Sequence, residues 1–149
     1  MLGSVGVDRP LQVARKSLTF TGAAGFGAAG TACNVFTVTG DVLIHAIIPK
    51  CTTLLTEAVA GATVSLGTAS QVARFIAATN SVDIDANEVW VSTTPTAGSI
   101  DLPDALQSVV IVNGDDIIVQ PATQNTNGGV IAFVVFWEAV SVDGSVVAA

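Results

Sequence analysis

Short apolar stretches recur along the chain and are separated by turn-forming residues. Apolar side chains alternate with Ser and Thr in Ser17–Thr21 and Ala62–Leu66, which is the period-two pattern of a half-buried strand, and a further strand is expected at Val35–Thr39. The segments Val42–Ile48 and Val130–Val140 are apolar at both odd and even positions, as expected of strands in the middle of a sheet. No segment shows a convincing amphipathic helical period. The pattern therefore predicts an all-β protein.

Turn residues divide the remaining sequence at short, regular intervals. Gly40-Asp41 favours a hairpin or bend, and Asn113–Asp116 has the composition of a hairpin turn. Pro103 restricts its segment to a sheet edge or a connection. Further strands are expected at Thr52–Ala58, Gln71–Ala78, Val89–Ser92, Ser108–Val112 and Ile117–Gln120. This spacing predicts one domain, an antiparallel sandwich, a jelly roll or a barrel-like fold.

Two segments lack a strand pattern. Residues 1–16 have neither a helical nor a strand period, so we expect an extended N-terminal arm followed by a β domain at residues 17–149. Gly22–Ala32 contains four glycines, which predicts a flexible loop or a place where backbones approach closely. This loop lacks the Lys and the Ser or Thr of a phosphate-binding P-loop. An ordinary loop is therefore the favoured interpretation.

Composition narrows the classes of protein further. The chain has 149 residues, of which 50% are apolar and 11% charged, and its mean hydropathy is +0.67. These values exclude a disordered tail. The net charge of -7 argues against a nucleic-acid partner, because phosphate binding needs clustered cations. The longest purely apolar run, Val130–Trp137, is too short to span a bilayer, and no secretory signal is evident. We expect a soluble protein without membrane association.

The charges are unevenly distributed. Arg9, Arg15 and Lys16 are opposed only by Asp8 in the first sixteen residues, whereas the rest of the chain carries two cations and eleven carboxylates. This asymmetry suggests that the arm docks onto an acidic surface of a neighbouring copy or of a partner. A solvated terminus that happens to contain a few charges is the alternative.

No residue set has the spacing of a catalytic or metal site. His45, the only histidine, lies within an apolar strand, so a core or interface histidine is favoured over a general base. Cys33 and Cys51 lack a metal-binding spacing, and buried free thiols are the default interpretation, with pairing left open. Trp90 and Trp137 could line a sugar-binding platform, but we favour the interpretation that they anchor the core.

The acidic residues are interpreted as parts of turns. Asp83, Asp85 and Glu88 resemble the start of a Ca²⁺ site but lack the glycine and distal glutamate of a calcium-binding loop. Adjacent Asp115 and Asp116 would face opposite ways in a strand, which does not suit a paired-carboxylate hydrolase. We therefore expect no bound metal, no cofactor and no enzymatic activity.

Three stretches of the sequence resemble a known class of protein. They are Ser108–Val119 (SVVIVNGDDIIV), the Gly128-Gly129 turn with the strand that ends at Phe136-Trp137, and Val142–Ala149 (VDGSVVAA). Across about Cys33–Ala149 the chain resembles the head decoration, or cement, proteins of tailed bacteriophages. The resemblance implies a β-rich fold, no catalysis, and dimers or trimers that extend a terminal arm over neighbouring major capsid protein subunits.

The resemblance implies a structural virion protein on the outer surface of the capsid, made in the host cytoplasm. We expect it to stabilise the shell by binding across major capsid protein subunits as a homo-oligomer, with a trimer favoured over a dimer. The alternative is a head-fibre or tail-fibre module that binds host carbohydrate, which would show an exposed aromatic pocket. A small hydrolase would need His45 and a carboxylate in one accessible cleft. The candidate partner-binding residues are Arg9, Arg15 and Lys16, and the candidate oligomer-interface residues are Ile131, Phe133, Val135 and Trp137.

Overall fold

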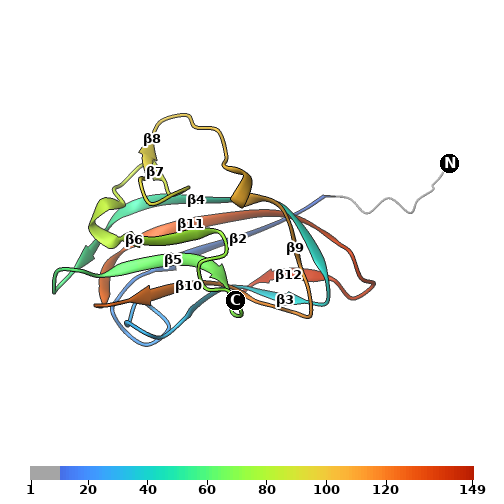
Figure 1. The fold of residues 1–149 in the computed structure, drawn as a ribbon, viewed down its shortest axis with the longest axis horizontal. Coiled ribbons are helices and arrows are strands. Elements are labelled where there is room, and N and C mark those ends of the chain that lie inside the picture. Colours follow the sequence, from blue (N-terminus) through green and yellow to red (C-terminus); the bar gives the residue numbers. More distant parts are fainter. Residues whose placement is uncertain (1–10) are drawn as a thin grey trace.

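Two antiparallel sheets pack face to face in the computed structural model, which describes residues 11–149 (Figure 1). The five-stranded sheet has the order β12 (Ser145–Ala148), β3 (Cys33–Thr39), β10 (Ile117–Ala122), β5 (Thr63–Thr68), β6 (Ile76–Asn80). The six-stranded sheet has the order β2 (Gln12–Thr19), β11 (Thr126–Ala139), β4 (Val42–Glu57), β7 (Glu88–Val89), β8 (Thr96–Ala97), and β9 (Gln107–Ile111) also pairs with β4. The predicted all-β sandwich is confirmed, and it is not a closed barrel.

The core lies between the sheets and is built by alternation along the strands. On β11, Ile131, Phe133 and Val135 are at most 1% exposed, whereas the residues between them are partly exposed. Opposite them, Phe36 of β3 and Leu66 of β5 are fully buried in the same cluster. Because successive side chains of a strand point to opposite faces, these positions fix which face of each sheet points inward.

The boundary of the predicted N-terminal arm is wrong. Gln12–Thr19 form β2, an edge strand that pairs with β11 from Thr19↔Val130 to Gln12↔Trp137. Ala14 and Leu18 are buried in the core. The polar sequence around them hides this strand, because an edge strand needs few apolar residues when a neighbouring strand supplies its hydrogen bonds. Residues 1–10 of the predicted arm, Arg9 among them, lie outside the described residues.

Several predicted turns connect different sheets. Gly40-Asp41 lies between β3 and β4, which belong to opposite sheets, so it is a bend and not a hairpin. The turn Asn113–Asp116 likewise leads from β9 in one sheet to β10 in the other. Thr52–Glu57 continues β4 without a break, and the segment predicted as a strand from Gln71 becomes one only at Ile76. Local turn chemistry specifies a reversal but not the strand that pairs next.

The glycine-rich loop between β2 and β3 is a site of close backbone approach. Gly27 has a φ of +115°, and a Cβ there would collide with the carbonyl oxygen of Thr126. The amide of Thr126 donates to the carbonyl oxygen of Gly27 at 2.9 Å. The glycine is therefore required by its positive φ and by the proximity of β11.

Candidate functional site

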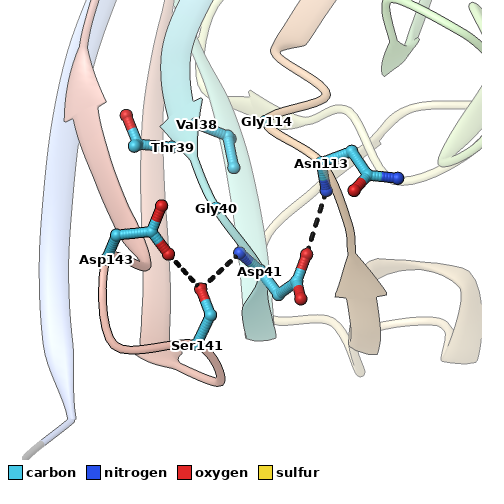
Figure 2. A pocket seen from close by; sticks show the side chains of 8 residues that line it. All are labelled: Val38, Thr39, Gly40, Asp41, Asn113, Gly114, Ser141 and Asp143. Carbon is cyan, nitrogen blue, oxygen red and sulfur yellow. Dashed lines mark hydrogen bonds between the residues drawn. The ribbon is translucent and has the colours of Figure 1, made fainter.

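A cleft of about 560 Å³ opens at one end of the sandwich, where three connections meet (Figure 2). These are the β3–β4 bend, the β9–β10 turn and the β11–β12 turn. The residues that line it are Val38, Thr39, Gly40, Asp41, Asn113, Gly114, Ser141 and Asp143.

The polar groups of this cleft bond to one another (Figure 2). The hydroxyl of Ser141 donates to Oδ1 of Asp143 at 2.6 Å and accepts from the amide of Asp41 at 2.9 Å. Oδ1 of Asp41 in turn accepts from the amide of Asn113 at 3.0 Å. This chain of hydrogen bonds ties the three connections together, as side-chain capping of turns does. The cleft holds no histidine or cysteine, and its serine faces carboxylates without a general base of the triad type.

Outside the cleft, His45 and Glu138 form an ion pair, which is the one found within residues 11–149. Nε2 of His45 lies 2.6 Å from Oε1 of Glu138, and the two side chains are 38% and 34% exposed. His45 is the extra residue of a bulge, because Phe136 pairs with Ala46 and Trp137 with Ile44. The histidine is thus a paired surface residue on an open sheet face. Neither His45 nor Glu138 lines the end cleft.

Cys33 and Cys51 are free, fully buried thiols on opposite sheets. Burial raises the pKa of both groups. For Cys51 the pKa rises from 9.0 to about 11; a hydrogen bond to Thr53 opposes the effect of burial, and the charges of Glu88 and Asp85 add to it. Because the thiolate is the reactive form, we expect both cysteines to react slowly while the protein is folded.

We expect a thiol reagent such as Ellman's reagent to label neither cysteine in the native protein at neutral pH and both after denaturation. The raised pKa of Cys51 also makes stability depend on pH. Between pH 9 and about 11 the unfolded state releases this proton and the folded state keeps it, so the free energy of unfolding falls as the pH rises. Urea titrations at pH 8 and pH 10, with a Cys51→Ser variant as the control, measure the difference.

The carboxylates considered as Ca²⁺ ligands serve the local chain. Oε2 of Glu88 accepts the amide of Asp85 at 2.8 Å, and Oδ2 of Asp83 accepts the side-chain amide of Asn80 at 3.3 Å. Within residues 11–149, no three His, Cys, Asp or Glu side chains are grouped so that they could hold a metal ion. The structure thus also separates Cys33, His45 and Cys51 as a potential ligand set.

Asp115 caps a turn, whereas Asp116 bonds to a strand. Oδ1 of Asp116 accepts the amide of Val38 at 2.8 Å. Asp115 accepts both the amide and the hydroxyl of Ser70, at 2.9 and 2.5 Å. Partial burial by itself would raise the pKa of Asp115, but the hydrogen bonds from Ser70 and Thr68 outweigh it and lower the pKa.

We expect a chelator to leave the thermal unfolding midpoint unchanged, because the carboxylates above already have hydrogen-bond partners. Differential scanning calorimetry with EDTA, with added Ca²⁺ and with neither measures this. A midpoint that falls in EDTA and returns with Ca²⁺ would instead make Asp83, Asp85 and Glu88 metal ligands, since ligand binding to the folded state raises its stability.

The predicted cationic cluster does not form from the residues that the structure describes. Arg15 is exposed on the outward side of β2, whereas Lys16 follows it on the inward side, opposite Phe133. The amino group of Lys16 donates to the carbonyl oxygen of Ala149 at 2.5 Å. Alternation along a strand separates these neighbours, so Arg15 and Lys16 cannot meet one partner surface together. Arg9 lies outside the described residues.

The predicted oligomer interface used the wrong face of β11. Ile131, Phe133 and Val135 pack in the core of this chain, and Trp137 is partly buried against the same core. The sequence shows that β11 is apolar on both faces, but it does not show which face the second sheet covers. The opposite face, which begins at Val130, is therefore the one that remains open.

We call this open side of the six-stranded sheet the outer face. Its centre is formed by Val130, Ala132, Val134 and Phe136 of β11, all partly exposed. Flanking strands contribute Val13 and Arg15 (β2), Leu43, Ala46, Ile48 and Lys50 (β4) and Val110 (β9), in register with β11 or β4. The largest exposed apolar side chains on it are Val110, at 57%, and Val13, at 42%.

The outward side of the five-stranded sheet is different in character. Gln120 of β10 and Thr63 of β5 point outward, and the segment around Gln71 and Val72 crosses over Gly67 of β5. Ser65, on the same side, donates to the carbonyl oxygen of Val72 at 2.9 Å. The outward side of the five-stranded sheet is thus partly covered by this segment.

The fold is similar to that of a chain in a solved phage capsid. A chain in the "Cyanophage Pam1 capsid asymmetric unit" matches 91% of this chain over 89% of its own length, with a TM-score of 0.57 and 17% sequence identity. A chain in the "Capsid of Ralstonia phage GP4" is 20% identical over 93% of this chain and 90% of its own, with a TM-score of 0.49. The resemblance to phage capsid-associated proteins that the sequence indicates is confirmed at the level of the fold by the first of these chains.

Other comparisons identify no relatives. No protein-family model matches the sequence, and no curated protein matches it. Among residues 11–149, no helix has the length and hydropathy needed to cross a bilayer.

Proposed function

We propose that this chain is a structural protein of a tailed-phage virion, which decorates the outer surface of the capsid and stabilises it by binding across major capsid protein subunits. The observation that carries this proposal is the likeness of the fold to a chain in a cyanophage capsid, which extends over about nine-tenths of both chains.

The chemistry of the surface agrees with a role without catalysis. The carboxylates and the serine of the end cleft are engaged in loop-to-loop hydrogen bonds. A protein that binds only the assembled shell stabilises it by mass action. Many copies on one particle also gain from multivalency, so a modest affinity at each contact gives durable attachment.

The alternative function, a fibre module that binds host carbohydrate, has less support. Carbohydrate sites present exposed aromatic rings. Within residues 11–149, Phe26 is the one aromatic residue that is largely exposed, at 51%. Trp90 is completely buried and its indole nitrogen donates to the hydroxyl of Thr79 at 3.0 Å. The sandwich thus uses this tryptophan as a core residue.

Binding to undecorated phage heads tests the proposal. We expect the purified protein to co-sediment with heads that lack it, with saturable stoichiometry, and to raise the temperature at which the heads rupture. Heads already carrying the protein serve as the control for free sites, and an unrelated acidic β-sandwich of similar size serves as the control for trapping. Absence of saturable binding, together with binding to a host-glycan array, would favour the fibre module.

A further inference from the structure

The charges on the outer face follow a regular order along the strands. Arg15 pairs with Val134 and Lys50 with Ala132, so both cations flank the part of β11 that precedes Phe136. Glu138 lies two positions beyond Phe136 and pairs with Leu43. Oε1 of Glu138 lies 2.6 Å from Nε2 of His45 on the same face. One part of the face thus carries two cations without an ion-pair partner, and the other part carries the paired carboxylate of Glu138.

The two cations have no carboxylate partner within residues 11–149. The ion pair found there joins His45 to Glu138, and neither Arg15 nor Lys50 has one. Both side chains are exposed in a chain whose net charge is -7. Unpaired cations beside an apolar strip suit a partner surface that is apolar in its centre and carries carboxylates at matching positions.

The outer face itself has this complementary pattern. If a second copy packs face to face with its strands antiparallel to the first, a two-fold axis across the strands passes through the Phe136 position. The axis then sets each strand against the same strand of the partner and exchanges positions two residues before Phe136 with those two residues after it. Arg15 of β2 therefore comes to the level of the partner's Glu138, which lies on the adjacent strand β11. Lys50 comes towards the start of the partner's β4.

The other face-to-face two-fold arrangement is unfavourable. An axis that runs along β11 would place each β11 position opposite the same position of the partner and would set β2 against the partner's β4. Arg15 would then lie near the partner's Lys50, and Glu138 would meet the partner's Glu138. Like charges in direct opposition cost affinity, so the charge order selects the antiparallel arrangement.

We propose that the outer face is a two-fold interface between two copies of this chain, centred on Phe136. The interface is isologous: the same strip of β11 packs on itself, Val134 and Ile48 fill the space beside the axis, and the cations of each copy face the acidic end of the other. This geometry gives a dimer in place of the trimer that the sequence favours. It requires no capsid, so it stands or falls independently of the proposed function.

The size of the face suits a small interface. Four neighbouring strands at about 4.8 Å spacing and ten residues at about 3.4 Å give a face roughly 15–20 Å by 34 Å, or about 500–700 Å². This is somewhat less than the roughly 800 Å² that each partner buries in a standard interface. Two sheets pack about 10 Å apart when side chains of this size interdigitate.

The first test is the oligomeric state of the purified full chain by sedimentation velocity. We expect a dimer for the native protein and a monomer for Val134→Glu, which places a carboxylate beside the axis. The matched control is Val147→Glu, the same substitution on the outward side of β12, where Val147 is 54% exposed. This control is expected to remain a dimer, and circular dichroism of each variant verifies that it is folded.

A charge-reversal variant keeps the test valid if Val134→Glu fails to fold. Arg15→Glu changes an exposed side chain, and we expect it to weaken dimerisation by roughly 10-fold to 100-fold at low salt, because it appears twice in a symmetric dimer. The matched control is Arg74→Glu, an exposed arginine in the segment beside the other sheet, which is expected to leave dimerisation unchanged.

Cross-linking tests the position of the axis. A residue on a two-fold axis meets its own copy, so Phe136→Cys is expected to form an intermolecular disulfide under mild oxidation, whereas Val147→Cys is not. Cys33 and Cys51 are buried and do not compete. A monomeric native protein would overturn the proposal, as would a trimer or a dimer that persists in Val134→Glu. If a monomer instead binds heads and Val134→Glu abolishes that binding, the outer face is a capsid contact and the dimer proposal is wrong.

Discussion

Deleting residues 1–16 is expected to prevent folding, whereas deleting residues 1–10 is expected to leave the sandwich folded. The longer deletion removes five of the eight residues of β2, including the buried Ala14, and exposes the edge of β11 from Phe133 onward. The loss of strand pairing and apolar burial amounts to several kcal/mol, a large part of the roughly 5–15 kcal/mol by which domains of this size are stable. The shorter deletion ends before β2 begins.

Circular dichroism and urea unfolding of the two truncated proteins measure this difference. The sequence pattern makes the opposite prediction for the longer deletion, since it assigns residues 1–16 to an arm that contributes little to the core. A cooperative unfolding transition of native midpoint in the longer truncation would therefore restore that interpretation and contradict the role of β2 as an edge strand. Binding of the shorter truncation to undecorated heads at two salt concentrations then isolates the contribution of Arg9 and its neighbours to attachment.

Trp90→Ala is expected to reduce the free energy of unfolding by about 3–5 kcal/mol, the range for removal of a buried aromatic side chain. Trp90 is the largest fully buried side chain of the described residues, and it follows the short strand β7. Its indole nitrogen donates to Thr79 of β6, which belongs to the opposite sheet, and its amide donates to Pro49 of β4. The residue thus ties both sheets together at the side of the sandwich away from β2.

Two further variants separate the contributions of packing and of hydrogen bonding. Trp90→Phe keeps most of the apolar volume but loses the indole donor, and we expect a loss of about 1–3 kcal/mol. Phe26→Ala removes an aromatic side chain that is 51% exposed and is expected to change stability by less than about 0.5 kcal/mol. Urea titration measures all three. An equally small effect for Trp90→Ala would show that the protein does not depend on this contact between the sheets.

The structure changes the sequence-based account of the candidate site in a specific way. The run Val130–Trp137 was predicted to hold an interface because it is apolar on both faces, and the structure shows that Ile131, Phe133 and Val135 lie in the core. The missed signal was in the neighbouring strands. Val13 and Arg15 lie in a segment without a clear strand period, so their pairing with Phe136 and Val134 was not evident.

The sequence by itself determined the class of the fold. Period-two alternation, turn residues and an excess of Val and Ile predict a β-sandwich, because these local preferences act on each strand separately. The sequence also predicts that Cys33, Cys51 and Trp90 are buried, because residues of these types are commonly buried, and all three are.

The tertiary structure decided which strands pair and which face of each is covered. Gly40-Asp41 and Asn113–Asp116 reverse the chain, but only the packing of the two sheets makes each turn cross from one sheet to the other. Likewise, β2 begins at Gln12 because the edge of β11 supplies hydrogen bonds to it. A strand apolar on both sides carries no local information on which side is inward. That choice depends on residues far apart in the sequence, and it leaves the outer face around Phe136 open.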